Sequence, residues 1–599
     1  MPMSRSQKIA ILISGILLVL LLVVGLFIGL IWMTFRDNAP NIADNSVLVL
    51  KLEGSLPDYA PEDPLGARLL GRDDRSLASL LMQIKKAKAD QRVKAILLDI
   101  GLTQVGWGKA DEIRDTIADF RTSGKPVYAH MEFATNKEYY IATACDRIYV
   151  DPIGNLFIVG LAADVMSLRG SLDKLGVYPD FYQIGKYKTA PEQWTRKEMS
   201  EASREVVNAI LDDFFGRFVN TVATARNKSP EDVRTLIDNA PLRATQAKDA
   251  GLIDGANYRD EVEDELKKRL GYKEPDKLRL VKHNDYRRVA PESLGLNEGE
   301  RIAVIFATGP IGSGESNEGS AFSGRTVGSD TIVKALNDAR EDKRIKAIIL
   351  RVDSPGGTSY ASDLIWHAVE KAKEKKPVVV SMGDVAASGG YYIACTANKI
   401  IAQPTTITGS IGVFAGKPVM KGFYDWIGAN NEYILRGKNA GLFRETEPFT
   451  PEERAQFETM LKGFYYDDFL PKVAKGRNKD VEYIDSIAQG RVWTGTQAKE
   501  RGLVDEFGGL EKAVEVAKQL ANIPAEKGVR RVVLPTPRTF LQQWLGGGDN
   551  EASVMTEQQR AAFAALPEDI RRVLQHAAFL DRLQRGETMA MLPFDLRIR

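Results

Sequence analysis

The sequence is poor in the two side chains that most often build metal and thiol sites. Its 599 residues include only two cysteines and four histidines. Cys145 and Cys395 both lie in apolar stretches, which is typical of buried free thiols rather than of a disulfide. No Cys/His pattern has the spacing of a zinc site, and no glycine-rich loop has the Walker pattern. We therefore expect neither a metal nor a cofactor.

An excess of charge of one sign is also missing. Lys and Arg total 81 against 80 for Asp and Glu, so the formal net charge is +1. Domains that bind nucleic acid usually carry a positive excess, so this balance gives no case for a nucleic-acid partner. With 44% hydrophobic and 27% charged residues, the composition is that of an ordinary globular protein. The length is sufficient for several domains.

One long apolar run stands near the N-terminus, at residues 9–35. As a helix it would span about 40 Å, enough to cross a hydrocarbon core of about 30 Å with some tilt. No small-residue cleavage site follows it, so we predict a retained membrane anchor rather than a signal peptide. Arg5 and Lys8 precede the run, whereas Arg36 after it is balanced by Asp37. The positive-inside rule then places the N-terminus in the cytoplasm and the rest of the chain outside.

The remainder of the chain repeats itself at a spacing of about 252 residues. Three stretches of the first half have a similar stretch 251 or 252 residues later: 92–98 at 344–350, 139–142 at 391–394, and 245–254 at 496–505. Three matches within one residue of the same spacing indicate a tandem duplication. The predicted division is an N-terminal part with the anchor (1–45), a first repeat (46–275), a linker (276–299), a second repeat (300–525) and a partly helical tail (526–599).

Each repeat alternates short β-branched runs with helical patterns. Strands are predicted at 47–50, 95–98, 302–305 and 347–350, with helices at 76–90 and 328–342. This alternation is typical of an α/β fold with a largely parallel sheet covered by helices.

The stretch 383–392 carries the candidate nucleophile, Ser388. A valine run at 378–380 is predicted to be a buried strand and 391–395 the start of a helix, so Ser388 lies where strand turns into helix. Backbone N–H groups are free there, and the helix dipole favours negative charge. A serine so placed can attack a carbonyl and leave the resulting oxyanion facing N–H donors. The plainer interpretation is that Ser388 only caps the helix.

The first repeat lacks this arrangement. At the position equivalent to Ser388 it has Asn136, which offers no nucleophile. Gly356 and Gly357 follow a strand of the second repeat only, and such a glycine pair lets the backbone approach a ligand and aim an N–H at it. One of these two glycines and Gly389 are therefore the candidate oxyanion donors.

A serine nucleophile needs a base to take its proton. His367 is predicted to lie within a helix among apolar neighbours, and His130 lies on a strand of the first repeat, so neither is favoured. A lysine can serve instead if burial lowers its pKa towards neutrality.

Aligning the Gly-Lys pairs of the two repeats matches Lys186 with Lys438 and Lys188 with Ala440. Lys188 thus occurs only in the repeat that lacks the serine. These complementary losses favour one composite site made of Ser388 and Lys188, although Lys188 is also interpretable as an ordinary loop lysine.

Taken together, these features resemble the signal peptide peptidase A family of bacterial membrane-anchored serine proteases, peptidase family S49, in its long, duplicated form. The shared motifs are the anchor, the two repeats, Ser-Pro-Gly-Gly at 354–357, Ala-Ser-Gly-Gly-Tyr-Tyr at 387–392, Gly-Lys-Tyr-Lys at 185–188 and Thr-Gly-Ser-Ile-Gly-Val at 408–413. The resemblance implies a Clp/crotonase-like fold for each repeat. It also implies a Ser/Lys dyad of Ser388 and Lys188, in which Ser410 orients the lysine amine.

The resemblance further implies a single-pass homotetramer in the bacterial inner membrane, with its catalytic part on the periplasmic side. Its substrates would be signal peptide remnants and other unfolded hydrophobic peptides. We expect Ile411, Gly412 and Val413 to form a strand that pairs with the extended substrate. Two other functions remain open: a crotonase-like acyl-thioester enzyme, which would need neither serine nor anchor, and a non-catalytic membrane scaffold.

Overall fold

The computed structural model describes residues 40–60, 75–273, 275–317, 325–536, 588–592 and 597–598, with isolated helical residues between 15 and 26. Most of the predicted anchor, its flanking charges, residues 537–587 of the tail and His576 lie outside the described residues. Within the described part of the chain, no helix is long and apolar enough to cross a membrane.

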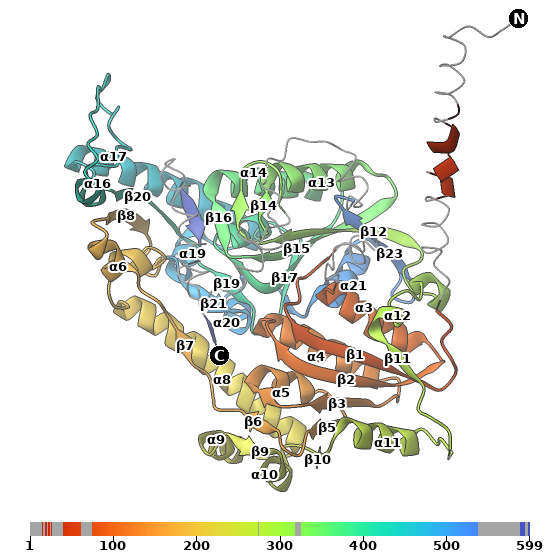
Figure 1. The fold of residues 1–599 in the computed structure, drawn as a ribbon. Helices are drawn as coiled ribbons and strands as arrows, with labels where there is room; N and C mark the ends of the chain where they lie inside the picture. Colours follow the sequence, from red (N-terminus) through yellow and green to blue (C-terminus); the bar gives the residue numbers. More distant parts are fainter. Residues whose placement is uncertain are drawn as a thin grey trace, which may run out of the picture.

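The first repeat is built on a parallel sheet with the strand order β10-β5-β3-β2-β1-β11 (Figure 1). Its strands are β1 (Ser46–Gly54), β2 (Val93–Thr103), β3 (Val127–Met131), β5 (Arg147–Val150), β10 (Gly255–Ala256) and β11 (Leu280–Lys282). The central strands are rich in Val, Ile and Leu and are buried along most of their length, as is usual for a parallel sheet covered on both faces.

The second repeat contains the corresponding sheet, in the order β22-β18-β17-β15-β12-β23, with β19 and β21 added beside β17. Its strands are β12 (Glu300–Thr308), β15 (Ile345–Ser354), β17 (Val378–Ala387), β18 (Lys399–Ala402), β19 (Ile407–Gly409), β21 (Val492–Thr494), β22 (Glu506–Phe507) and β23 (Val529–Leu534). The predicted α/β class with parallel sheets is confirmed.

The duplication extends to the edge strands. Val47 pairs with Leu280 in the first sheet, as Ile302 pairs with Arg531 in the second. Strands β11 and β23 follow residues 275 and 525, the expected ends of the repeats. Each sheet therefore includes one strand from the predicted linker or tail.

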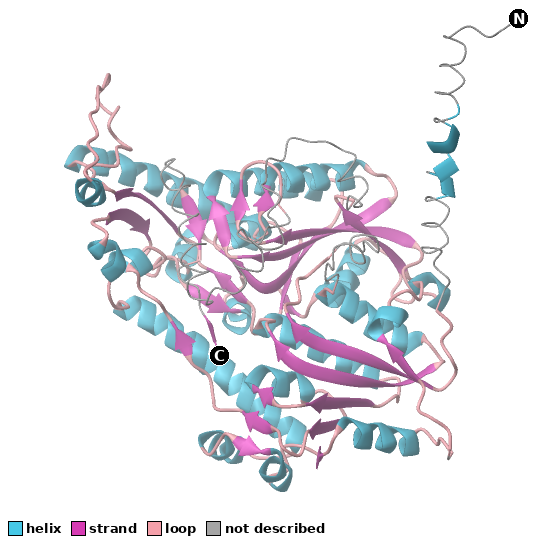
Figure 2. Ribbon diagram, viewed as in Figure 1, coloured by secondary structure: helices cyan, strands magenta, loops and turns pink. Residues whose placement is uncertain are grey.

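Helices surround both sheets (Figure 2). In the first repeat they are α3 (Leu77–Ala89), α4 (Trp107–Arg121), α5 (Asn136–Ala142), α6 (Arg169–Lys174), α7 (Glu192–Thr195), α8 (Glu201–Arg226), α9 (Pro230–Asp238), α10 (Ala244–Asp249), α11 (Arg259–Arg269) and α12 (His283–Tyr286). In the second they are α13 (Ser329–Glu341), α14 (Ser359–Lys373), α15 (Gly389–Ala394), α16 (Lys421–Ile427), α17 (Pro451–Lys462), the π-helix η2 (Gly463–Phe469), α18 (Leu470–Arg477), α19 (Val481–Ile487), α20 (Gly495–Glu500) and α21 (Leu510–Leu520).

A third sheet joins the two repeats, in the order β14-β13-β16-β24-β20-β8. Its strands are β8 (Tyr178–Ile184) from the first repeat, β13 (Ile311–Gly312), β14 (Val327–Gly328), β16 (Gly356–Thr358) and β20 (Val413–Val419) from the second, and β24 (Met589–Met591) from the tail. Smaller pairings involve β4 (Ala134–Thr135), β6 (Asn155–Phe157), β7 (Ala163–Asp164), β9 (Leu242–Arg243) and β25 (Arg597–Ile598). The candidate site lies where this third sheet meets the end of β17.

Candidate active site

Ser388 lies between β17 and α15, at the predicted junction of strand and helix. Its φ of 54° and ψ of −112° form a backbone conformation that is rare for a residue with a side chain. The backbone is held there because the Ser388 N–H donates a 2.8 Å hydrogen bond to the carbonyl of Gly409. The Ser388 side chain makes no capping hydrogen bond to α15. Ser388 therefore occupies the N-cap position of α15 but does not cap the helix with its side chain.

Lys188 contacts Ser388 although 200 positions separate them in the chain. The Nζ atom of Lys188 lies 2.7 Å from Oγ of Ser388, 3.0 Å from Oγ of Ser410 and 3.2 Å from the Ser410 carbonyl oxygen. All three residues are fully buried. Burial holds the pKa of Lys188 well below its ordinary value of 10.5. A neutral amine has two N–H donors for the Ser410 oxygens and one lone pair for the Ser388 hydroxyl, so the geometry fits the neutral form.

Ser410 is itself fixed by the backbone. It also has a positive φ, of 52°, and its N–H donates a 2.7 Å hydrogen bond to the carbonyl of Arg491. Because two of its oxygens contact Lys188, Ser410 determines where the amine can lie relative to Ser388.

The backbone around Lys188 rests on a loop of the second repeat. The Tyr187 N–H donates a 2.7 Å hydrogen bond to the carbonyl of Gln489. Gly490, with a φ of 76°, lies so close that a Cβ atom there would be 2.5 Å from Cα of Lys188. Sequence analysis missed Gly490. Comparison of the repeats could have identified it, because the aligned residue of the first repeat is Asn239, so this glycine occurs only in the second repeat.

Replacing Gly490 by alanine is expected to displace Lys188 and to lower kcat on the order of 10²-fold, because a small misplacement of a catalytic group is costly. The matched control is Gly428→Ala, since Gly428 has a similar φ of 74° but no atom within 4 Å of the added methyl group. Steady-state kinetics and thermal unfolding of both variants check this. Equal kcat values in the two variants would contradict the proposed contact.

The three candidate oxyanion glycines lie together beside Ser388. A Cβ atom on Gly389 would lie 3.0 Å from the Gly357 nitrogen, and one on Gly356 would lie 2.8 Å from the Gly389 nitrogen. The Gly356 N–H donates to Oγ of Ser354 at 3.2 Å. Gly357 is therefore better placed than Gly356 to be the second donor, next to Gly389.

The other candidate bases lie in different surroundings. His130 lies on β3, with its Nε2 2.9 Å from Oδ1 of Asp151. His367 lies on the exposed side of α14, and Lys438 is exposed in a loop. The hydrogen bonds of the Ser388 hydroxyl are instead with Lys188 and, at 3.4 Å, with the carbonyl of Gly412.

Of the expected strand at Ile411, Gly412 and Val413, only Val413 lies in a strand, while the pairing of this stretch with substrate stays a prediction. The Ile411 carbonyl accepts a hydrogen bond from the Gly490 N–H, and β20 begins only at Val413. A Cβ atom on Gly412 would lie 2.8 Å from Cα of Gly490, so two loops cross here instead of forming a ladder.

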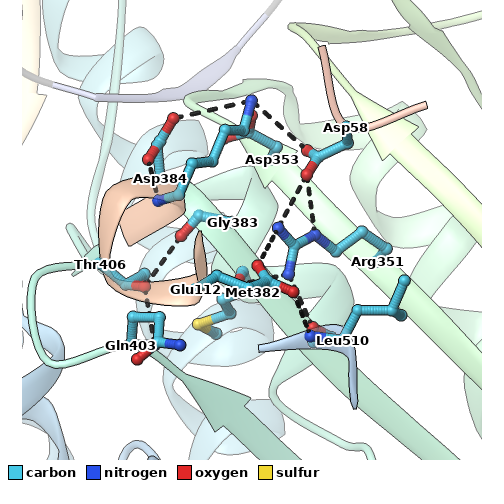
Figure 3. A network of polar contacts seen from close by, with 12 residues as sticks. Asp58, Glu112, Arg351, Asp353, Met382, Gly383, Asp384, Gln403, Thr406 and Leu510 are labelled. Atoms are coloured by element: carbon cyan, nitrogen blue, oxygen red, sulfur yellow. Dashed lines mark hydrogen bonds and ion pairs between the residues drawn. The ribbon is translucent and has the colours of Figure 1, made fainter. Parts of the chain in front are cut away.

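A buried network of charges joins the two repeats next to this site (Figure 3). Nη2 of Arg351, on β15, lies 2.7 Å from Oδ1 of Asp58 and 2.8 Å from Oε2 of Glu112. The other Glu112 oxygen accepts a 2.6 Å hydrogen bond from the Leu510 N–H at the start of α21. Sequence analysis did not identify this network.

A second part of the network holds the strand ends that lead into the site. Nζ of Lys109, on α4, lies 2.8 Å from Oδ2 of Asp353, the next-to-last residue of β15. The backbone N–H of Lys109 donates a 2.8 Å hydrogen bond to Asp384, near the end of β17. The first repeat thus fixes both strands from which the candidate site is built.

The sequence of this chain is similar to those of known proteins. A model of peptidase family S49 matches both repeats, at residues 119–273 and 370–524. The serine protease SPPA, chloroplastic, of Arabidopsis thaliana is 39% identical over 520 residues, covering 86% of this chain and 75% of the relative. Protease 4 of Salmonella typhi is 34% identical over 515 residues, covering 82% and 81%. A solved structure of a ClpP1 mutant from Listeria monocytogenes aligns over 35% of this chain and 94% of its own, with 16% identity and a TM-score of 0.22.

The predicted family is confirmed by the family model, which matches both repeats, and by the two proteases, whose similarity extends over most of the chain. The relatives are proteases, which favours a protease over an acyl-thioester enzyme or a scaffold. The chain belongs to peptidase family S49 and is a serine protease.

Proposed function

We propose that the protease uses Ser388 as its nucleophile and Lys188 as its general base, each supplied by a different repeat. The observation that carries this proposal is the 2.7 Å contact between the buried Lys188 amine and the Ser388 hydroxyl. Lys188 takes the hydroxyl proton as Oγ attacks a peptide carbonyl, and then gives it to the leaving amine. Water releases the acyl group by the reverse sequence, while Ser410 keeps the amine in place.

The N–H groups of Gly357 and Gly389 hold the oxyanion that forms during the attack. Preorganised donors of this kind are each worth about 10²–10³ in rate. Gly356 allows the backbone to pass close to Ala387, because it has no side chain. A Cβ atom on Gly356 would lie 3.0 Å from the Ala387 carbonyl oxygen. The close approach of β16 to the end of β17 thus needs a glycine at this position.

The substrate is an unfolded, hydrophobic peptide that binds as an extended strand between β16 and β20, in the place that the tail strand β24 occupies in this structure. Trp194, Ala190 and Phe414 form an apolar cluster beside this position. A pocket of about 670 Å³ is lined by Tyr360, Met460 and Phe464 together with Asp363, Asp467 and Asp468, among other residues. Signal peptide remnants are apolar and can bind in an extended form, so they are the proposed substrates. Each repeat is proposed to have a Clp/crotonase-like fold.

We also propose that residues 9–35 anchor the enzyme in the bacterial inner membrane as a homotetramer, with the repeats on the periplasmic side. The anchor, but not the tetramer or the orientation, is supported by the exposure of the described apolar side chains of this stretch, which are 59–68% exposed: Leu18, Val19, Leu20, Leu22, Val23 and Leu26. Membrane fractionation and light scattering of the detergent-solubilised enzyme test the two parts. Recovery in the soluble fraction, or a monomer mass, would contradict them.

The experiment that tests the proposed function combines an apolar fluorogenic peptide with a fluorophosphonate, which phosphonylates a nucleophilic serine. The full-length enzyme is expected to cleave the peptide and to carry the reagent on Ser388, as located by mass spectrometry of digests. A folded Ser388→Ala variant should do neither. Peptide cleavage that survives in this variant would exclude Ser388 as the nucleophile.

A further inference from the structure

The tail strand β24 marks the path of an extended peptide along β16. The Ser359 N–H donates a 2.9 Å hydrogen bond to the Thr588 carbonyl, and Gly357 is opposite Ala590. The Ala590 carbonyl oxygen lies 3.0 Å from the position of a Cβ atom on Gly389, so it faces the candidate oxyanion donors. In a substrate with this register, the residue in the place of Thr588 is therefore two residues before the one whose carbonyl is attacked.

The pocket of about 670 Å³ adjoins this place, because Thr588 is one of its lining residues. Successive side chains of a strand point to opposite faces, so a side chain in the place of Thr588 is directed away from the apolar cluster that contains Met589. The wall of the pocket combines three carboxylates with apolar side chains: Asp363, Asp467 and Asp468 with Tyr360, Met460 and Phe464. This combination is suited to a long aliphatic side chain with a positively charged end.

The carboxylates of the pocket are only partly neutralised. Nζ of Lys472 contacts Oδ1 of Asp363, which also accepts a 2.7 Å hydrogen bond from the Tyr392 hydroxyl. The same Nζ atom lies 3.4 Å from Oδ1 of Asp468. Asp467 is exposed, and no ion pair with it is found in the described part of the chain. Three carboxylates thus share one ammonium group, which leaves the pocket attractive to a second cation.

Ser359 adds a polar group that has no partner in the fold. It lines the same pocket and is 5% exposed, and its Oγ atom has no hydrogen-bond partner among the described residues. Buried hydroxyl groups are normally hydrogen-bonded, and leaving one unpaired costs free energy. The hydroxyl is therefore an independent sign that a polar group of a ligand belongs in this pocket.

The first repeat lacks the acidic pair. The sequence Arg-Asn-Lys at 226–228 recurs at 477–479, and in this spacing of 251 residues Asp467 and Asp468 align with Gly216 and Arg217. The helix differs as well: α8 runs through Gly216 and Arg217 as an α-helix, whereas the π-helix η2 carries both aspartates. Such π-helical turns are rare and are frequent at functional sites. The acidic pair and the π-helix thus occur only in the repeat that supplies Ser388.

We propose that this pocket binds the side chain of a lysine or arginine two residues before the one whose carbonyl is attacked. The carboxylates hold the charged end by charge-assisted hydrogen bonds, while Tyr360, Met460 and Phe464 pack against its aliphatic part. This inference rests on the proposed function and narrows the substrates to apolar peptides that contain a basic residue. Such a residue occurs where the positively charged segment of a signal peptide meets its apolar segment.

The first test uses the full-length enzyme and three fluorogenic apolar peptides that differ only at this position, which is Lys, Met or Glu. We expect kcat/KM to be about 10-fold higher for the Lys peptide than for the Met peptide, and lowest for the Glu peptide. Mass spectrometry of the products is expected to place the cut after the second residue that follows the lysine.

The outcomes of this test separate the inference from the proposed function. Equal kcat/KM values for the three peptides, or a lysine preference with the cut at another bond, would overturn the inference and leave the proposed function standing. An enzyme that cleaves none of the three peptides would contradict the proposed function itself.

The second test changes the charge of the pocket. The double variant Asp467→Asn/Asp468→Asn is expected to lower the Lys-to-Met ratio of kcat/KM to about 2 or less. Asp467→Lys/Asp468→Lys is expected to cleave the Glu peptide faster than the Lys peptide, a gain that an unfolded variant cannot show. The matched control is Asp338→Asn, which removes an exposed carboxylate of α13 and should keep the wild-type ratio. A wild-type ratio in the double Asn variant would overturn the assignment of the preference to this pocket.

Discussion

Replacing Lys188 by methionine is expected to lower kcat for peptide cleavage by about 10⁴–10⁶-fold, the range seen when one member of a serine-protease catalytic unit is removed. Methionine keeps most of the side-chain volume but cannot accept the Ser388 proton. The matched control is Lys186→Met, two residues earlier, where the native side chain is exposed. Steady-state kinetics with an apolar peptide, on both variants and the wild type, measure the effect.

Loss of activity through unfolding is distinguishable from loss of the base. In the unfolded chain Lys188 is protonated below its ordinary pKa of 10.5, whereas burial keeps it neutral in the folded protein down to a much lower pH. Between these two pKa values the unfolded state binds more protons, so the free energy of unfolding rises with pH by about 1.4 kcal/mol per unit. Lys188→Met removes this term and is expected to be at least as stable as the wild type at neutral pH. A near-wild-type kcat in this stable variant would show that Lys188 is not the general base and would leave Lys438 or His367 as the next candidates.

Replacing Arg351 by methionine is expected to lower the free energy of unfolding by about 3–5 kcal/mol, because it leaves buried carboxylates without their partner. Asp58 and Glu112 both contact Arg351, and all three side chains are at most 3% exposed. The matched control is Arg344→Met, which removes an exposed arginine paired with Asp342 and should cost no more than about 1 kcal/mol. Urea unfolding monitored by tryptophan fluorescence measures both changes.

Similar unfolding free energies for the two arginine variants would show that the network does not hold the repeats together. Loss of Arg351 is also expected to affect the site, because Asp353 and Asp384 belong to the same network and lie near the ends of β15 and β17, the strands that precede Gly356 and Ser388 (Figure 3). Kinetics of Arg351→Met are therefore measured at a temperature where the variant is still folded.

The sequence alone predicts the parts of this protein that depend on repeated local patterns. The strands and helices of the two repeats follow from hydrophobic periodicity, and the duplication gives their correspondence. The juxtaposition of Ser388 and Lys188 was foreseeable because each residue is missing from the other repeat. That comparison needs no three-dimensional information.

Other features depend on partners that are distant in the chain. Arg351 appears in the sequence only as a basic residue within an apolar strand, and its partner Asp58 lies in the other repeat. The tail strand at 589–591 is too short to show a period, and strand formation there depends on the free edges of β16 and β20. The strand that now begins at Val413 was predicted to begin at Ile411. The sequence of this stretch resembles a strand, but Gly412 lies against Gly490 in another loop.

The most direct test of a shared Ser388–Lys188 site is the pH dependence of Ser388 phosphonylation by a fluorophosphonate. In the wild type the rate is expected to rise with pH as one group loses its proton, with a midpoint well below 10.5, because only the neutral Lys188 amine can take the serine proton. In Lys188→Met the rate is expected to be very low and to lack this step. The same midpoint in both proteins would show that Lys188 does not activate Ser388 and would contradict the composite site.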